Sequence, residues 1–150
     1  MRTVIQRVSY ASVTIEGKVH GKIEKGYMIL VGICDEDTEE TVRKMAEKIS
    51  KLRIFEDDAG KMNLSILQAG GAVLSISQFT LYAVCRKGNR PSFDKAGKPE
   101  LAQRLYLYFN DVLRELGLHV EEGIFGAEMK VELLNDGPVT ICLDSAELMK

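Results

Sequence analysis

The first third of the chain alternates short apolar segments with turn residues, which predicts a series of strands. Apolar and polar residues are interleaved over residues 4–8, and a second extended piece covers residues 11–15. Glu16-Gly17-Lys18 predicts a hairpin turn, because glycine tolerates the positive φ at which two strands reverse, and residues 18–23 then return. Residues 27–33 form a continuous apolar run, as expected of a strand that is buried on both faces.

Two later segments have the periodicity of amphipathic helices. The first is predicted over residues 38–51, where apolar residues recur at helical spacing and either Asp37 or Thr38 can serve as the N-cap. The second begins at Pro99, because the first turn of a helix accepts proline, and it ends at Gly117. Each helix is expected to bury one apolar face.

Further extended pieces are predicted at residues 72–76, 118–122, 129–135 and 139–144. Asn135-Asp136-Gly137-Pro138 separates the last two and is typical of a turn, with a cis bond before the proline as the alternative. The pattern therefore predicts one mixed α/β domain over residues 1–150, with a strand-rich, largely antiparallel core and two main helices.

The composition narrows the class of protein. With 20 basic and 22 acidic side chains, the net charge of −2 argues against a general DNA-coating protein or a polybasic membrane binder. We expect no signal peptide, because the first ten residues are charged and lack a long apolar stretch, and no window is apolar enough to span a membrane. The 3 widely spaced cysteines form no CxxC pair, so we interpret them as buried thiols in a reducing cytoplasm.

One segment departs from this balanced charge. Residues 84–98 form a long polar loop, and loops of this length in a compact domain are usually functional or disordered. Between Arg86 and Lys98, five basic residues oppose one acidic residue, which gives a local net charge of +4 against −6 for the rest of the chain. The loop either binds a phosphate backbone or is a solvated loop, and the charge count leaves both interpretations open.

Few residues in the sequence are suited to side-chain catalysis. His20 and His119 have no partner at metal-binding spacing, so a surface or strand-end position is the simpler interpretation of each. The chain has no GxSxG, Walker A or GxGxxG motif, and the acidic Glu56-Asp57-Asp58 lacks the spacing of a calcium loop. We therefore predict neither a metal nor a cofactor.

Ser77-Gln78-Phe79-Thr80 lies at the end of the strand predicted over residues 72–76. Its hydroxyl and amide side chains can recognise a polar ligand, and exposed backbone N–H groups there can stabilise an oxyanion. Alternatively, Ser77 and Thr80 merely satisfy backbone groups at the end of the strand. The residue pattern alone does not decide between these two interpretations.

Taken together, five segments resemble the D-aminoacyl-tRNA deacylase family over nearly the whole chain. They are MRTVIQRVSYASVTIEG at the start, LRIFEDDAGKMNLSI (52–66), SQFTLYA (77–83), RKGNRPSF (86–93) and FGAEMKVELLNDGPVT (125–140). The SQFT and NxGPxT motifs, in this order and at this separation, are highly specific for that family.

The resemblance implies a fold and an activity. The expected fold is a barrel-like sheet in a layered α/β/β arrangement. The expected reaction is hydrolysis of the ester that joins a D-amino acid, or glycine mischarged on tRNA(Ala), to the terminal ribose of tRNA, while L-aminoacyl-tRNA is rejected. A non-catalytic tRNA-binding module is the alternative function.

The resemblance also implies a homodimer whose active site lies at the interface. Ser77, Gln78, Phe79 and Thr80 of one subunit would face a cis Gly137-Pro138 bond of the other, whose carbonyl groups accept from the substrate's amino group and exclude an L side chain. Backbone N–H groups around Phe79 and Thr80 would form an oxyanion hole, and the ribose hydroxyl would assist proton transfer. Thr80 without an adjacent base is a weak nucleophile, so we expect it to position the substrate.

The remaining candidate residues surround these two motifs. Arg7 is expected to support the Gly-Pro loop of the partner subunit. Two apolar side chains are expected to line the pocket, namely Phe125 and Met129. The residues expected to contact the acceptor end of tRNA lie in the basic loop and are Arg86, Lys87 and Arg90.

Overall fold

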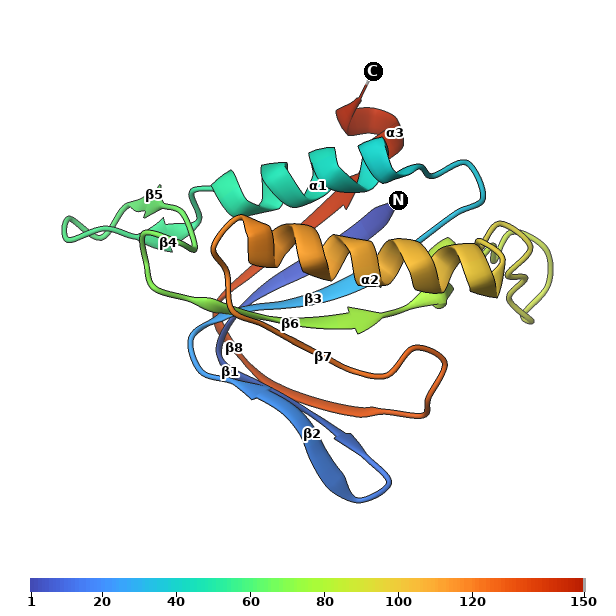
Figure 1. The fold of residues 1–150 in the computed structure, drawn as a ribbon, viewed down its shortest axis with the longest axis horizontal. Helices are drawn as coiled ribbons and strands as arrows, with labels where there is room; N and C mark the ends of the chain where they lie inside the picture. The colour runs from blue at the N-terminus through green and yellow to red at the C-terminus, as the bar shows by residue number, and fades with distance from the viewer. Residues whose placement is uncertain (150) are drawn as a thin grey trace.

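The long first strand organises the fold. The computed structural model describes residues 1–149, and in it β1 (Arg2–Ile15) pairs with three other strands, all antiparallel to it (Figure 1). The first half of β1 pairs with β3 (Gly26–Gly32) and the second half with β2 (Lys18–Ile23). β8 (Lys130–Asp144) runs along the other side of β1 for nearly its whole length.

The sheet extends from β3 through β6 (Ala72–Ser77) to β7 (Val120–Glu122), and both of these additional pairings are parallel. Its far edge curls back toward β2, where Nδ1 of His20 lies 3.0 Å from the carbonyl oxygen of Glu122. The result is a nearly closed, barrel-like sheet. The mixed α/β, strand-rich architecture predicted from the sequence is therefore confirmed.

Two helices, α1 (Glu39–Lys51) and α2 (Pro99–Glu115), lie side by side on one face of the sheet (Figure 1). Thr38 is the N-cap of α1, because its side chain accepts the N–H of Thr41. Asp37, the other candidate, instead accepts from the buried α-ammonium group of Met1 at 2.6 Å. The largest core cluster fills the space between the helices and the sheet, and its fully buried members include Ile5, Ile29, Met45, Ile49, Leu105 and Phe109.

Shorter elements complete the chain. β4 (Phe55–Glu56) and β5 (Met62–Leu64) form a small hairpin after α1, and a 3-10 turn, η1 (Phe79–Tyr82), follows β6 directly. The short helix α3 (Ser145–Leu148) continues from β8. Within residues 1–149, no helix has the length and apolar character needed to cross a membrane.

The prediction of a turn at residues 135–138 is wrong. β8 continues through this segment from Lys130 to Asp144, and both of its halves pair with β1. The register shifts on either side of Val8, so the extra residues are taken up as an irregularity within one strand instead of reversing the chain. The bond between Gly137 and Pro138 is cis, and both residues are exposed.

Candidate active site

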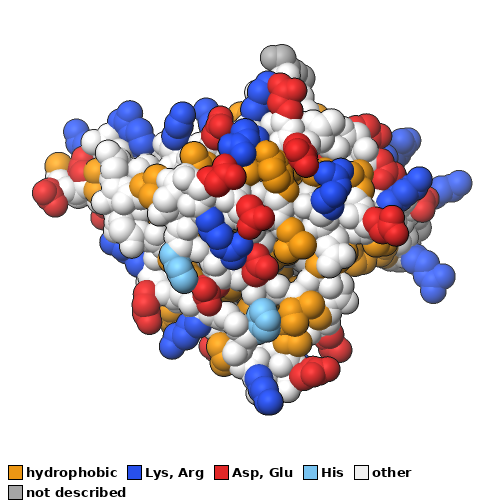
Figure 2. All heavy atoms as spheres, viewed as in Figure 1, with side chains coloured by type: hydrophobic (Ala, Val, Ile, Leu, Met, Phe, Trp, Pro, Cys, Tyr) orange, Lys and Arg blue, Asp and Glu red, His pale blue; other side chains and the backbone are white. Residues whose placement is uncertain are grey.

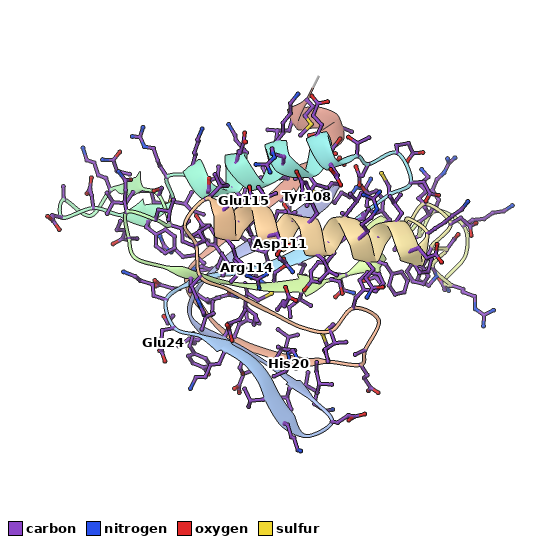
Figure 3. All side chains as sticks on the ribbon, in the orientation of Figure 1. His20, Glu24, Tyr108, Asp111, Arg114 and Glu115 are labelled. Atoms are coloured by element: carbon purple, nitrogen blue, oxygen red, sulfur yellow. The ribbon has the colours of Figure 1, made fainter. Side chains whose placement is uncertain are left out.

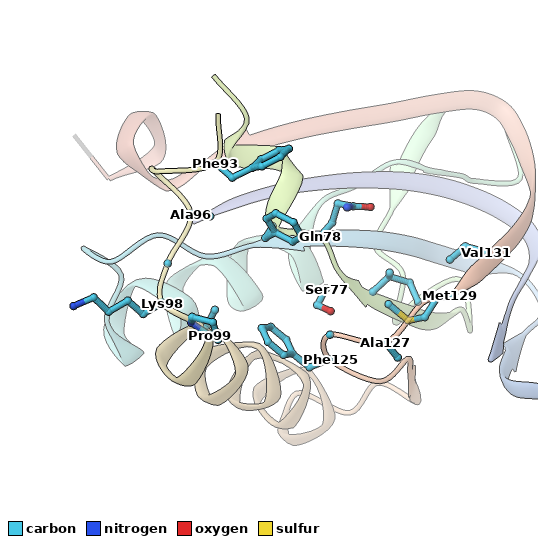
Figure 4. A pocket seen from close by; sticks show the side chains of 15 residues that line it. Ser77, Gln78, Phe93, Ala96, Lys98, Pro99, Phe125, Ala127, Met129 and Val131 are labelled. Atoms are coloured by element: carbon cyan, nitrogen blue, oxygen red, sulfur yellow. The ribbon is translucent and has the colours of Figure 1, made fainter. Parts of the chain in front are cut away.

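A cavity of about 760 Å³ opens between the end of β6, the start of α2 and the segment that leads into β8 (Figure 4). Ser77, Gln78 and Phe79 line one side of it, and Phe125 and Met129 line another. The structure thus brings together two segments that the sequence analysis selected separately. A largely apolar pocket with a few polar groups at one end is the usual form of a small-molecule site.

The 3-10 turn after β6 determines how the polar end of the cavity is presented. The N–H of Gln78 donates to the carbonyl oxygen of Val31 at 2.7 Å, which fixes the point where the chain leaves the sheet. Among the described residues, no hydrogen bond uses the backbone N–H of Phe79 or Thr80. These two groups are therefore free to donate to a ligand at the start of the turn.

Thr80 lies beside the cavity and is not part of its lining. Its hydroxyl group accepts a hydrogen bond from Nε2 of Gln78 at 2.6 Å. No histidine or carboxylate side chain in the described part of the chain bonds to this hydroxyl group, so nothing there would take its proton. The geometry suits a positioning role for Thr80 better than a nucleophilic one.

Arg2 and Asp144 support the far end of the same 3-10 turn. Nη1 of Arg2 donates to the Leu81 carbonyl at 3.0 Å, and its guanidinium group lies 4.5 Å from the centre of the Tyr82 ring. Nε of Arg2 also binds Oδ2 of Asp144 at 3.0 Å. Partial burial by itself raises the pKa of Asp144, but the Ala146 N–H and the Arg2 guanidinium outweigh this effect and hold the pKa below its ordinary value.

A buried tyrosine joins two walls of the cavity. The hydroxyl group of Tyr106 on α2 donates to the Ser75 carbonyl at 2.6 Å, and the N–H of Gly123 reaches the same oxygen at 3.3 Å. The Tyr106 ring also contacts Phe125, with 6.3 Å between the ring centres. Burial raises the pKa of Tyr106, so the hydroxyl group remains a donor at neutral pH. Tyr106 therefore sets the spacing between β6 and the segment that carries Phe125.

Arg7 holds the Gly-Pro loop of its own chain, and its expected support of the partner's loop stays a prediction. Its guanidinium group is buried and donates to the Ile54 carbonyl at 2.6 Å and to the Asp136 carbonyl at 3.1 Å. Antiparallel pairing of β1 with β8 causes this contact, because it places Arg7 opposite the irregular segment that precedes Gly137. The arginine thus fixes the entry to the cis peptide bond from within the same subunit.

Gly137 and Pro138 do not line the cavity of their own chain. Val131, which does line it, is six residues earlier in the same strand. At a rise of about 3.3 Å per residue, the two positions are roughly 20 Å apart along β8. Within one chain, therefore, the structure brings the Ser77–Thr80 segment to Phe125 and Met129 but does not bring it to the Gly-Pro bond.

The basic loop lies at the end of the molecule next to the cavity. Figure 2 shows Lys and Arg side chains projecting from this end. Arg86, Lys87 and Arg90 are exposed, and within residues 1–149 none of them forms an ion pair. The loop also contributes Phe93 and Lys98 to the cavity lining.

The other candidates for chemistry lie outside this site. His20 is an exposed residue of β2 (Figure 3), and Nε2 of His119 lies 3.0 Å from Oε2 of Glu121. Asp57 accepts the backbone N–H groups of Lys61 and Ala59, as expected of a solvated turn. Two of the three cysteines, Cys85 and Cys142, are exposed, which contradicts the expectation of buried thiols, and Cys34 is half-buried. In the described part of the chain, no three His, Cys, Asp or Glu side chains converge as potential metal ligands.

Comparison with known proteins assigns this arrangement to a family. Residues 4–144 match the model of the family described as D-Tyr-tRNA(Tyr) deacylase. The chain belongs to this family. It is 58% identical to a D-aminoacyl-tRNA deacylase of Thermus aquaticus over 98% of this chain and 97% of the relative. It is 59% identical to one of Brevibacillus brevis over 97% and 100% of the two chains.

Solved structures of similar proteins share the fold of this chain. A structure titled c-Myc DNA Unwinding Element Binding Protein superposes with a TM-score of 0.90 at 42% identity, covering 96% of this chain and 98% of the other. A probable eukaryotic D-amino acid tRNA deacylase superposes with a TM-score of 0.82 at 16% identity, covering 95% and 97% of the two chains. At that identity the second structure supports the fold alone.

Two residues of the site were not singled out in the sequence. Tyr106 falls within a helical apolar stripe and looks like any other core residue there. Phe93 is the only aromatic residue in an otherwise polar and basic loop, and that contrast is the signal that would have drawn attention to it.

Proposed function

We propose that this protein is a hydrolase that cleaves the ester bond of D-aminoacyl-tRNA and leaves L-aminoacyl-tRNA intact. The observation that carries the proposal is the cavity lined by Ser77, Gln78 and Phe79, next to the start of a 3-10 turn whose Phe79 and Thr80 N–H groups form no hydrogen bond among the described residues. Membership of the deacylase family supports the same reaction. The proposal needs no catalytic triad, since an aminoacyl ester is already activated.

The proposed reaction begins when water attacks the carbonyl carbon of the ester. The developing oxyanion accepts hydrogen bonds from the N–H groups of Phe79 and Thr80, which lie ready at the start of the turn. The bond between the carbonyl carbon and the ribose oxygen then breaks, and the neighbouring ribose hydroxyl helps to deliver a proton to that oxygen. Free D-amino acid and tRNA leave the site.

We propose that selectivity requires a second copy of the chain. Gly137 and Pro138 are exposed and roughly 20 Å along β8 from the cavity that they would complete. Among the described residues, β8 pairs only with β1, so its other edge is free to meet another subunit. In such a homodimer the carbonyl groups of Gly137 and Pro138 bind the amino group of the substrate and leave no room for an L side chain. Glycine has no side chain, so glycyl-tRNA fits as well.

The basic loop would meet the acceptor end of the tRNA. Arg86, Lys87 and Arg90 are exposed and form no ion pair within residues 1–149, and the loop that carries them also lines the cavity, which supports phosphate contacts by these side chains. The patch is small relative to a whole tRNA, so the enzyme would bind chiefly the end of its substrate. We place this activity in the cytoplasm, where aminoacyl-tRNA is used.

The experiment that tests the proposal compares tRNA charged with D-Tyr and with L-Tyr. We expect rapid release of D-Tyr and little release of L-Tyr. Equal rates, or no release from either substrate, would refute the proposal. Binding of tRNA without any ester cleavage would instead identify a non-catalytic tRNA-binding module.

A further inference from the structure

Two exposed phenylalanines form a pair at the mouth of the cavity. Phe79 is 55% exposed and Phe93 is 38% exposed, although each is large and apolar. Their rings contact edge to face, with 5.1 Å between the ring centres. Both side chains line the cavity (Figure 4 labels Phe93). Clustered aromatic side chains that remain in solvent generally indicate a binding surface.

The loop that carries Phe93 is held in place at its base. The N–H of Val84 donates to the Ser92 carbonyl at 2.8 Å, and the N–H of Ser92 returns a bond to the Val84 carbonyl at 2.9 Å. The Phe93 carbonyl accepts the N–H of Ala96 at 3.0 Å. These bonds fix the backbone on both sides of Phe93, so little conformational freedom would be lost when a ligand contacts the ring.

The charge around the aromatic pair identifies the class of ligand. Between Arg86 and Lys98 the loop carries five basic residues and one acidic residue. Exposed aromatic rings set in a basic surface are the combination that binds single-stranded nucleic acid, in which bases stack on rings while phosphates meet cations. A protein partner would not require this excess of positive charge.

We propose that Phe93 is a stacking platform for an unpaired nucleobase of the RNA, one that lies just before the terminal aminoacylated nucleotide. This inference rests on the proposed function, because it assumes that the terminal nucleotide and its amino acid occupy the cavity. The chain of the RNA then leaves the cavity past Phe93, and its phosphates pass the basic loop. Phe93 thus helps to bind the single-stranded end and takes no part in the ester chemistry.

The test uses a four-nucleotide RNA with a D-amino acid joined to its 3′ end through a non-hydrolysable amide. Its affinity is measured by fluorescence anisotropy with the wild type, with Phe93→Leu and with Phe93→Tyr. Leu107→Ala is the matched control, because Leu107 is an apolar side chain of similar exposure, 40%, on α2 outside the cavity. A second RNA lacks the base immediately before the terminal nucleotide.

We expect Phe93→Leu to weaken binding about five- to 150-fold without changing the slope of affinity against salt, because stacking is worth about 1–3 kcal/mol per base and releases no counterions. Phe93→Tyr should retain the wild-type affinity, and so should Leu107→Ala. Removing the base should cost the wild type the same factor and cost Phe93→Leu nothing further, since both changes delete one contact. An unchanged affinity for Phe93→Leu, or equal effects of base removal in the two proteins, would overturn the inference.

Hydrolysis of D-Tyr-tRNA by the wild type separates this inference from the proposed function. If the ester is cleaved but the effects of the two changes are additive, only the stacking role of Phe93 fails. If the ester is not cleaved but the effects of the two changes are not additive, Phe93 still stacks on the base. The protein then binds RNA without hydrolysing the ester, and only the proposed function fails.

Discussion

Replacing Arg7 with lysine tests whether this side chain fixes the Gly-Pro segment from within its own subunit. Arg7 is buried and its guanidinium group bonds two carbonyl oxygens at once, those of Ile54 and Asp136, at 2.6 and 3.1 Å. A lysine ammonium is a point donor on a flexible stem and can replace one of these bonds but not both. A hydrogen bond to a charged group contributes about 1.5–3 kcal/mol, so Arg7→Lys should lower the free energy of unfolding by about that amount.

Thermal unfolding at one fixed protein concentration measures this loss. For a chain of this size, about 2–4 °C of melting temperature corresponds to 1 kcal/mol, so we expect Arg7→Lys to melt about 3–12 °C lower. Arg43→Lys is the matched control, because Arg43 also donates to two groups, Tyr108 and Glu115, and lies 5.7 Å from the ring of Tyr108. It does so at the surface, and this substitution should leave the melting temperature almost unchanged.

A second measurement connects the same arginine to selectivity. If Asp136 is no longer held, the carbonyl groups of Gly137 and Pro138 lose their fixed direction, and the ratio of D-Tyr to L-Tyr release from tRNA should fall in Arg7→Lys. Arg43→Lys should keep the wild-type ratio. Equal melting temperatures of the two variants would refute the reasoning. So would an Arg7→Lys variant that is destabilised but keeps the wild-type ratio of D-Tyr to L-Tyr release.

Three further predictions address other parts of the molecule. Asp144→Asn should destabilise the protein at pH 7 and progressively less below about pH 4. A lowered carboxylate pKa gives stability that is complete above the ordinary value of about 3.9 and is lost as the pH falls through the lowered value in the folded protein; urea unfolding over a series of acidic pH values checks this. Gly26→Ala should cost about 3 kcal/mol or more, since the added Cβ overlaps the Ala72 carbonyl, and a wild-type urea midpoint would contradict this. Tyr106→Phe should cost about 1–2 kcal/mol and lower kcat, whereas Tyr108→Phe, on the outer side of the same helix, should leave kcat unchanged in a steady-state hydrolysis assay.

Local patterns in the sequence predicted the elements well because those elements depend on local causes. The helical spacing after residue 38 and the proline at 99 both correspond to helices in the structure. The motif at residues 77–80 was placed correctly at the end of a buried strand. These features follow from the periodicity of burial and from the restricted backbone of proline, which act over a few residues.

Features that depend on the pairing of distant strands were not predictable in this way. Asn135-Asp136-Gly137-Pro138 has the composition of a turn, yet β1 is long enough to pair with the chain on both sides of it, so the segment stays within one strand. The partner of Arg7 follows from the same pairing, which no local pattern specifies. Tyr106 is indistinguishable from a core residue in the sequence, because its role depends on where the Ser75 carbonyl lies in space.

The continuity of β8 makes chain length itself a constraint on the site. The strand carries a cavity wall at Val131 and the cis Gly137-Pro138 bond six residues later, and it does so on a single ladder with β1. Inserting or deleting one residue between them would turn every following side chain to the opposite face of the sheet and shift the Gly-Pro bond along the ladder. The length of β8 thus sets the distance between the cavity wall and the Gly-Pro bond. We therefore expect the site to tolerate substitutions in this strand far better than insertions or deletions.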